Sequence, residues 1–413
     1  MERVKYGAAA WAHLTGRLPN SFPRTVGPRA MEYLAEIVET GLTVDMMGRF
    51  ERAFAEKLGV RHCIGTPGCT PALAVLAASL GGEAGDEIIV SPVTDYGTVQ
   101  GLIRENYIPV FADTAPGTMN LSAETIEPCI TDRTRAILVV HKTGIVCDMD
   151  PILALGKKHG IPVFEDVCQA VFSTYKGRYA GTMGKAAGFS FDSEKTMGAD
   201  VGGCVVTDDD ELAERMRFIG QSRAGVQKPH FGRLHTEAGY AYRMPQCTAA
   251  ICLAQLEIVD ENVARRDLVA RDISRRLAAI PGIVPEPIPD AQEVYSCWML
   301  AFSLEPGAFT CTTEEFASQC AEAGIPGAGA AAYYLMPDAL PFLDEWTEAG
   351  RFPYSTPPAS TKRRYTGVMC PTAREYVSRV VRWSTICEKY TDEHCAIAAE
   401  IVQVVADANR SRS

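Results

Sequence analysis

The sequence predicts an α/β fold in which a large domain carries a mainly parallel, doubly wound sheet and a smaller C-terminal α+β domain follows it. Three observations support this prediction. Short apolar runs recur between residues 30 and 255, helical stretches separate them, and near residue 256 the pattern gives way to a long charged helix. Runs that are apolar at almost every position are typical of strands buried on both faces, as in parallel sheets.

Seven of these runs have the length and the β-branched composition of buried strands. They span residues 62–66, 87–92, 108–113, 136–141, 161–166, 187–191 and 203–208. Helices are expected between strands, at 71–81, 122–130 and 150–160. Because helices alternate with strands, the strands are expected to run parallel, with helices on both faces of the sheet.

The C-terminal part follows a different pattern. A charged helix over 257–280 is expected to connect two domains. A strand at 297–304 and helices at 313–324 and 392–408 are expected in the smaller one. The predicted division is an N-terminal segment at 1–30, a large domain at 31–256 and a small domain at 257–413.

Composition restricts the class of protein. The chain of 413 residues carries a net charge of −11, which argues against a nucleic-acid partner, because phosphate backbones are bound by basic surfaces. The N-terminus lacks the apolar core of a signal peptide and no apolar run is long enough to span a bilayer, so a cytoplasmic location is expected. The fourteen cysteines include no C-x-x-C pair and no set at zinc spacing; we expect reduced thiols and no metal site.

Chemically useful residues follow the ends of several predicted strands, where ligands of open α/β sheets bind. Lys195, just past one strand, suits a Schiff base with a carbonyl cofactor, and Asp166, ending another, suits a protonated pyridinium nitrogen. Tyr96 could stack on a planar ring, and Ser190 could donate a hydroxyl to a phosphate. Taken singly, these residues have plainer interpretations: a solvated loop lysine, a helix cap or buried salt bridge, a core aromatic and a buried serine bonded to backbone.

A helix start after the first strand suits a phosphate group. Gly68, Cys69 and Thr70 precede Pro71, and we expect Thr70 to be the N-cap with Pro71 at the first helical position. Free N–H groups and the helix dipole at such an end attract a dianion. The same pattern also describes an ordinary capped helix.

A series of segments, all in one order, carries a family resemblance. They are GRFERAFAEKLGVRHCIGT (48–66), PALAVLAASLGGEAGDEIIVSP (71–92), IPVFADTAPGTMNLSAETIEPCIT (108–131), RTRAILVVHKTGIVCDMDPI (133–152), IPVFEDVCQA (161–170), GFSFDSEK (188–195), GGCVVTDDDEL (202–212) and GYAYRM (239–244). Together they resemble the sugar aminotransferases of the DegT/StrS type, a family of fold-type I enzymes that depend on pyridoxal 5′-phosphate (PLP). The resemblance covers residues 30–408 and implies this fold type and this cofactor, with pyridoxamine 5′-phosphate as its intermediate form.

The resemblance implies a role for each matching residue. Lys195 matches the Schiff-base lysine, which also moves the proton between Cα of the substrate and C4′ of the cofactor. Asp166 matches the partner of the pyridine nitrogen, Gln169 a residue beside the ring and its phenolic oxygen, and Tyr96 the stacked aromatic. Family members are homodimers with the site at the subunit interface.

The phosphate-binding positions match in part. Cys69 and Thr70 stand for a Gly-Thr pair whose N–H groups hold the phosphate, and Ser190 for a phosphate-binding serine. Cys69 therefore departs from the family. Ala241 departs as well, because the family has an Asn there that reaches the phosphate in the partner subunit.

Two further departures lie close to the expected site. Asp200-Val201 replaces the Gly-Glu that follows the lysine in the family, and Val171-Phe172 replaces a His-Gly pair. These changes predict retained PLP chemistry with an unusual acceptor pocket or an altered contact between subunits.

The resemblance implies transamination from glutamate or glutamine to a keto sugar, a sugar nucleotide or a cyclitol ketone. A dehydratase or eliminase of the same fold is the alternative, although relatives that begin from pyridoxamine phosphate often replace the lysine with His. A non-catalytic regulator is the second alternative. A metalloenzyme or dinucleotide reductase is disfavoured, because the sequence has neither a ligand set nor a G-x-G-x-x-G after a strand.

Two loops are candidates for substrate recognition. The loop at 221–239 carries Arg223 and Arg233 and could be an anion-binding flap or simply a solvated loop. The loop at 328–341, with Tyr333, is expected to shape the acceptor pocket.

Overall fold

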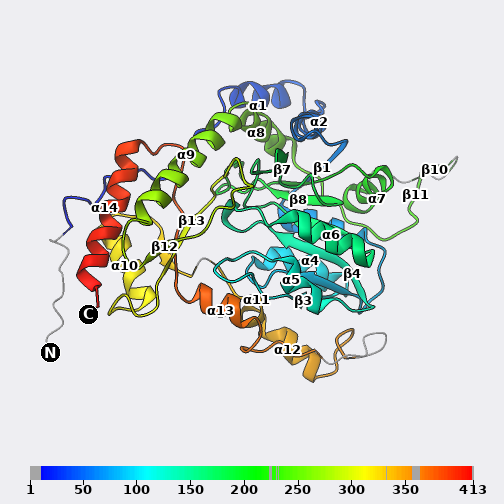
Figure 1. Ribbon diagram of the computed structural model, residues 1–413. Coiled ribbons are helices and arrows are strands. Elements are labelled where there is room, and N and C mark those ends of the chain that lie inside the picture. Colours follow the sequence, from blue (N-terminus) through cyan, green and yellow to red (C-terminus); the bar gives the residue numbers. More distant parts are fainter. Residues whose placement is uncertain are drawn as a thin grey trace.

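The computed structural model describes residues 11–222, 226–228, 230, 232–331, 333–355 and 363–411. Two sheets organise these residues, each with helices packed against it (Figure 1). The larger sheet is built by the first part of the chain, and the smaller one, built by the chain after the long helix α9 (Val259–Leu277), lies beside that helix.

The large sheet has seven strands and is mainly parallel, as predicted. In spatial order they are β1 (His62–Thr66), β9 (Gly203–Thr207), β8 (Ala186–Ser190), β5 (Val163–Asp166), β4 (Thr134–Val140), β2 (Glu87–Val90) and β3 (Ile108–Phe111). Only β9 runs antiparallel to its neighbours β1 and β8. The carboxyl ends of β2, β4, β5 and β8 therefore meet at one edge of the sheet.

Both faces of this sheet are buried, which confirms the doubly wound arrangement. Along β2, Ile89 packs into one apolar core, whereas Ile88 and Val90 pack into the other. The covering helices are α1 (Ala30–Glu39), α2 (Met46–Leu58), α3 (Cys69–Ala78), α4 (Tyr96–Arg104), α5 (Ala123–Ile126), α6 (Met149–His159), α7 (Asp210–Gln221) and α8 (Gln246–Leu256). The helix predicted at 122–130 is only one α-turn followed by a 3-10 turn at Glu127–Cys129, where Pro128 lacks the N–H that an α-helix needs.

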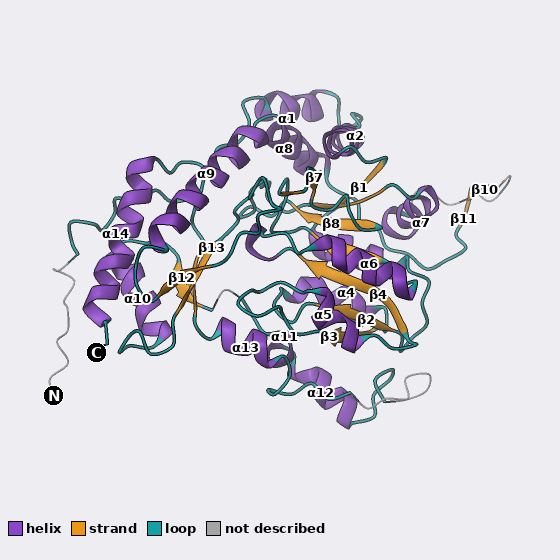
Figure 2. Cartoon of the chain, in the orientation of Figure 1, coloured by secondary structure: helices purple, strands orange, loops and turns teal. Residues whose placement is uncertain are grey.

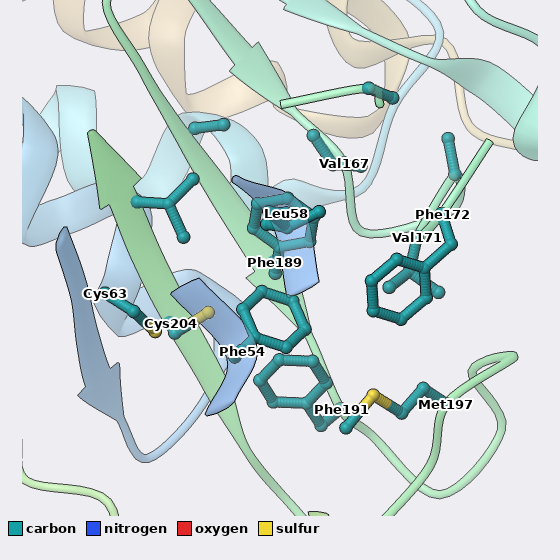
Figure 3. Packing of buried hydrophobic residues seen from close by; sticks show 14 of the residues in the cluster. Phe54, Leu58, Cys63, Val167, Val171, Phe172, Phe189, Phe191, Met197 and Cys204 are labelled. Atoms are coloured by element: carbon teal, nitrogen blue, oxygen red, sulfur yellow. The ribbon is translucent and has the colours of Figure 1, made fainter. Parts of the chain in front are cut away.

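An aromatic cluster lies between α2 and the large sheet (Figure 3). Phe54 contacts the rings of Phe172, Phe189 and Phe191 with centroids 5.2–5.6 Å apart. The Phe54 contacts with Phe189 and Phe191 are edge-to-face, a geometry that aromatic pairs prefer. The cluster supports the turn at 191–199, whose Met197 is also fully buried.

The smaller sheet is antiparallel and follows α9, in agreement with the predicted α+β pattern (Figure 2). Its strands, in spatial order, are β12 (Ile283–Pro285), β13 (Leu300–Leu304), β15 (Val380–Trp383) and β14 (Ala328–Ala330). Helices α9, α10 (Thr313–Ala323) and α14 (Asp392–Asn409) share its core. Trp11 and Leu14, from the N-terminal segment, are buried in the same core.

The segment between β14 and β15 packs on the large sheet instead. It forms α11 (Met336–Ala339), α12 (Pro341–Glu348) and α13 (Pro371–Val377), whose buried residues share a core with β2 and β3. Two short hairpins complete the described elements: β6 (Thr174–Tyr175) with β7 (Arg178–Tyr179), and β10 (Val226–Lys228) with β11 (Gly232–Leu234). Within the described ranges, no helix has the length and apolar character needed to cross a bilayer.

Candidate active site

A cavity of about 890 Å³ opens at the carboxyl edge of the large sheet. One side is formed by the ends of β5 and β8, the start of α3 and the turn that carries Lys195. The opposite side comes from the smaller sheet and its loops, through Trp298, Tyr333 and Arg382. Of the residues expected from the sequence, the cavity brings together Cys69, Thr70, Asp166, Ser190, Lys195 and Tyr333.

Lys195 lies in the turn after β8. Its backbone N–H donates to the Asp192 carbonyl at 3.0 Å, and its Nζ lies 3.9 Å from the centroid of the Trp298 ring. The Trp298 indole N–H donates to the Glu194 carbonyl at 3.0 Å, so the ring is tied to the turn itself. The lysine is thus a cavity residue held over an aromatic face rather than a freely solvated one.

Asp166 is the last residue of β5 and is 1% exposed. Its Oδ2 accepts a hydrogen bond from the Thr98 hydroxyl at 2.8 Å, and its Oδ1 accepts one from the Cys168 N–H at 3.0 Å. A buried carboxylate is costly without partners, and two neutral donors offset only part of that cost. The arrangement leaves the carboxylate suited to a cationic partner in the cavity.

The helix start differs from the one predicted. Helix α3 begins at Cys69, its N-cap is Gly68 rather than Thr70, and no side chain caps it. Pro71 is consequently the third helical residue, because the helix begins two residues earlier than a Thr70 cap would place it. The N–H groups of Cys69 and Thr70, in the first turn of the helix, have no intrahelical partner, and both residues line the cavity.

Close backbone approach shapes this helix start. A Cβ on Gly203 of β9 would come within 2.4 Å of the Gly68 carbonyl carbon and 2.6 Å of the Cys69 nitrogen. Only glycine at 203 lets the strand pass the first turn of α3 at this distance. Ser190, at the end of β8, lines the same part of the cavity and is 6% exposed.

Cys69, Cys168 and Asp166 come together at this end of the cavity, with donor atoms within 4.8 Å of one another. The sequence spacing gave no sign of this cluster, because the residues come from two different elements. The Cys168 thiol and burial raise the pKa of the Cys69 thiol well above its ordinary value. Cys69 is therefore a neutral thiol beside the helix start.

Sequence reasoning missed the turn at Lys142–Gly144, which follows β4. The Thr143 N–H donates to Oε1 of Gln169 at 2.8 Å, and the Nε2 of Gln169 is buried without a partner among the described residues. Lys142 is fully buried, and its Nζ also lacks a hydrogen-bond partner there. One signal in the sequence could have identified Lys142: it is a polar residue that comes, with His141, directly after a buried strand.

Lys142 contacts the cavity through an aromatic ring. Its Nζ lies 3.3 Å from the centroid of the Tyr333 ring, and the Tyr333 hydroxyl donates to Oδ2 of Asp95 at 2.8 Å. Burial and the Asp95 carboxylate raise the pKa of Tyr333, so the phenol stays protonated. Burial lowers the pKa of Lys142 to about 7.

Other expected site residues lie elsewhere. Tyr96 is the first residue of α4, 38% exposed, and it lines a second cavity of about 300 Å³ near Phe342, so its stacking role remains a prediction. Arg223 lies outside the described residues, and for Arg233, on β11, only the backbone is described. The flap prediction therefore stays untested.

Three of the departures from the family now have a structural setting. Val171 and Phe172 are buried in the aromatic cluster, and Phe172 has a φ of 62°. Ala241 is exposed between Tyr240 and Tyr242, whose rings stack at 4.5 Å. Val201 is 52% exposed at the rim of the cavity.

The donor set fits PLP on three counts. Unpaired N–H groups at the start of α3 suit its phosphate. Asp166 offers a buried carboxylate for a ring nitrogen, and Gln169 keeps an unpartnered N–H near the same edge of the sheet. Lys195 supplies an amine in the same cavity.

A mainly parallel seven-stranded sheet with this lysine, carboxylate and helix start at its edge is the arrangement of fold-type I PLP enzymes. Residues 27–382 match the model of the DegT/DnrJ/EryC1/StrS aminotransferase family, and the chain belongs to this family. The family consists of PLP-dependent transaminases, which makes this chain an aminotransferase.

Relatives agree with this placement. The chain is 36% identical over 298 residues to GDP-perosamine synthase of Caulobacter vibrioides, covering 71% of this chain and 79% of the relative. It is 34% identical over 265 residues to a putative L-glutamine:3-amino-2,3-dideoxy-scyllo-inosose aminotransferase of Streptoalloteichus tenebrarius, covering 62% and 63%. The crystal structure of 3-amino-5-hydroxybenzoic acid synthase superposes with a TM-score of 0.81 at 26% identity, covering 95% of this chain and 99% of that one.

Proposed function

We propose that this aminotransferase moves an amino group from glutamate or glutamine to the carbonyl of a keto sugar, a sugar nucleotide or a cyclitol ketone. The observation that carries the proposal is the meeting of Lys195, Asp166 and the start of α3 in one cavity. The names of the two relatives, a GDP-perosamine synthase and an amino-cyclitol aminotransferase, support the acceptor class.

Each protein group has a separate task in this proposal. PLP, when bound, supplies a conjugated ring that withdraws electrons from the substrate Cα. The Asp166 carboxylate keeps the proton on the ring nitrogen, and the N–H groups of Cys69 and Thr70, with the Ser190 hydroxyl, hold the phosphate. Lys195 would hold the cofactor and, once freed by the incoming amine, its Nζ would take the proton from Cα of the substrate and deliver it to C4′ of the cofactor.

The opposite wall excludes water and positions the substrate. Trp298 packs against Lys195, and Tyr333 fixes the loop after β14 to the start of α4 through Asp95. The acceptor then enters the same cavity, and Lys195 moves the proton in the reverse direction. One lysine therefore serves both half-reactions.

We also propose a homodimer in the cytoplasm. The exposed stretch around Ala241 corresponds to a family segment that reaches the partner's cofactor site, which supports a shared site. With Ala241 in place of Asn, this contact would lack its side-chain amide.

The direct test is an absorption spectrum of the purified protein with PLP, before and after excess L-glutamate or L-glutamine. We expect the band of the bound cofactor to shift to that of the pyridoxamine form with at least one donor. Lys195→Ala should lose turnover by several orders of magnitude, because the proton carrier is gone. Lys185→Ala, which removes a lysine paired with Asp209 outside the cavity, is the matched control.

Two results would contradict the proposal. A spectrum that no amino acid changes would favour an eliminase, and the absence of any cofactor band would favour a non-catalytic role. Normal turnover by the Lys195→Ala variant would remove the assignment of that residue.

A further inference from the structure

Arg382 is the third residue of β15 and lines the cavity opposite Lys195. Its strand neighbours are small: Ala301 on β13 and Gly329 on β14. A Cβ on Gly329 would lie 3.1 Å from Nε of Arg382, so the glycine leaves the space that the guanidinium occupies. The fold thus makes room for this side chain at the cavity wall.

The guanidinium has no partner among the described residues. Its Nε is buried without a hydrogen bond, and no carboxylate lies within ion-pair distance. Neighbouring arginines differ: Arg266 binds Glu388 and two carbonyls, and Arg379 binds Glu375 and the Leu304 carbonyl. A buried donor without an acceptor is destabilising. The Arg382 guanidinium is therefore better suited to binding a ligand than to stabilising the fold.

Four acidic residues line the cavity, and two of them, Asp95 and Asp166, are engaged elsewhere. Asp95 accepts from the Tyr333 hydroxyl and the Gly97 N–H, and Asp166 accepts from Thr98 and Cys168. Neither forms an ion pair with Arg382. With Lys195 and the start of α3 assigned to the cofactor, Arg382 is the cation that remains for a substrate among the described residues that line the cavity.

We propose that Arg382 binds an oxyanion of the substrate through two parallel N–H···O bonds. This inference rests on the proposed aminotransferase function. A planar guanidinium matches a carboxylate or a phosphoryl group equally well. The carboxylate would come from the amino donor, and the phosphoryl group from a nucleotide-linked acceptor.

Equilibrium binding separates these two sources. The PLP-loaded enzyme is titrated with 2-methylglutamate, which carries the donor carboxylates but no Cα proton, and separately with GDP, by calorimetry. We expect Arg382→Gln to weaken the binding of one of these two ligands at least tenfold. Arg382→Lys should weaken it less, because lysine keeps the charge but lacks the two parallel N–H donors of a guanidinium. Weaker binding of 2-methylglutamate would show that Arg382 binds the donor carboxylate. Weaker binding of GDP would show that it binds the phosphoryl group of the acceptor.

Controls make the result specific. Arg275→Gln removes the same charge from an exposed position on α9 and should change neither affinity. Thermal stability of the Arg382→Gln variant should not fall, because the side chain stabilises nothing in the described fold. Unchanged binding of both ligands by Arg382→Gln would overturn the inference, even if wild-type enzyme transaminates. Failure of wild-type enzyme to respond to glutamate or glutamine would instead count against the proposed function.

Discussion

Lys142 and Glu286 are buried residues of opposite charge, and burial favours the neutral form of both. Burial lowers the pKa of Lys142 to about 7, and it raises the pKa of Glu286 to about 7. Thr143 links them: it follows Lys142 in the chain, and its hydroxyl donates to Oε2 of Glu286 at 3.0 Å. Lys142 also lies against the Tyr333 ring, which lines the cavity.

These shifts predict a specific pH dependence. Between pH 4.5 and about 7 the folded state keeps the Glu286 proton that the unfolded state loses, so the free energy of unfolding falls as pH rises. Between about 7 and 10.5 the unfolded state holds the Lys142 proton that the folded state lacks, so the free energy of unfolding rises with pH. The contribution of the pair is therefore smallest near neutral pH.

Lys142→Met should raise stability at pH 7 by about 1–4 kcal/mol, because an apolar side chain of similar length replaces a buried amine without an acceptor. In the same variant, the free energy of unfolding should increase less between pH 7 and 10 than it does in the wild-type protein. Urea denaturation of the PLP-loaded protein at several pH values measures both effects. Lys158→Met, on the surface of α6, should change neither, and a destabilised Lys142→Met variant would show that the amine has a partner in the folded protein.

Among single residues, the sequence predicted the candidate site residues that lie at or just after the ends of strands. Asp166 and Ser190 end strands, and Lys195 follows one within a short turn, so the apolar period located them, whereas their expected roles came from the family resemblance. Lys142 and Arg382 were missed for different reasons. Lys142 has the composition of any loop lysine, and the importance of Arg382 depends on the absence of a partner, which only packing reveals.

Among the elements, the start of α3 is set by how closely β9 passes it. Gly203→Ala would place a Cβ 2.4 Å from the backbone at Gly68 and push the first turn of α3 away from the strand. We expect at least tenfold weaker PLP binding, because the N–H groups proposed to hold the phosphate move with that turn.

Gly68→Ala is the control for Gly203→Ala. The backbone at Gly68 is extended, and the nearest contact of an added Cβ would be an ordinary 3.4 Å. Equal PLP affinities in the two variants would contradict this account, and equilibrium titration of the cofactor measures them.

The turn after β5 holds a bulky residue in the left-handed region. Phe172 has a φ of 62°, and its ring packs on Phe54 with centroids 5.6 Å apart. Phe172→Ala should cost about 3–5 kcal/mol through lost packing. Phe172→Gly should be more stable than the alanine variant by about 1 kcal/mol, because glycine adopts this φ without strain.

Thermal or urea unfolding of both Phe172 variants checks this order. A glycine variant less stable than the alanine variant would mean that the backbone leaves the left-handed region once the ring is gone. Phe189→Ala and Phe189→Gly provide the comparison within the same cluster. Because Phe189 lies on a strand, its alanine variant should be more stable than its glycine variant.

Strands were predicted more closely than helix starts. The run at 62–66 matches β1 to the residue, because its apolar period ends where burial ends. The Thr70 cap was wrong, because sequence chemistry favoured a side-chain cap and the observed helix begins without one. The helices α1, α2, α4, α7 and α8 were not delimited; in the first four, a polar face interrupts the apolar runs used to find elements.

On the scale of the whole molecule, the site depends on two sheets that are distant in the chain. Tyr333 joins them: its loop pairs with the large sheet through a Leu335–Val93 bridge, and its hydroxyl reaches Asp95 at 2.8 Å. The division into domains remains a prediction, and the helices between β14 and β15 share the core of the large sheet.

Tyr333→Phe should raise the KM of the acceptor several-fold with a small change in kcat, because one net hydrogen bond is worth about 1 kcal/mol and it fixes the wall rather than the reacting atoms. Tyr334→Phe, at a 59% exposed neighbour, is the matched control. Steady-state kinetics with each substrate varied measures the effect. A fall in kcat with unchanged KM would instead place the Tyr333 hydroxyl in the chemistry.

The burial of Trp11 and Leu14 against α14 has a consequence for the order of synthesis. Trp11 is 2% exposed, and Arg17 pairs with Glu393 at 2.9 Å, so this segment finds its contacts on a helix that is translated much later. On the ribosome the large sheet can assemble while this apolar segment still lacks its native neighbours. The smaller core therefore closes only after α14 has been translated, and until then Trp11 is open to any chaperone that binds exposed aromatic residues.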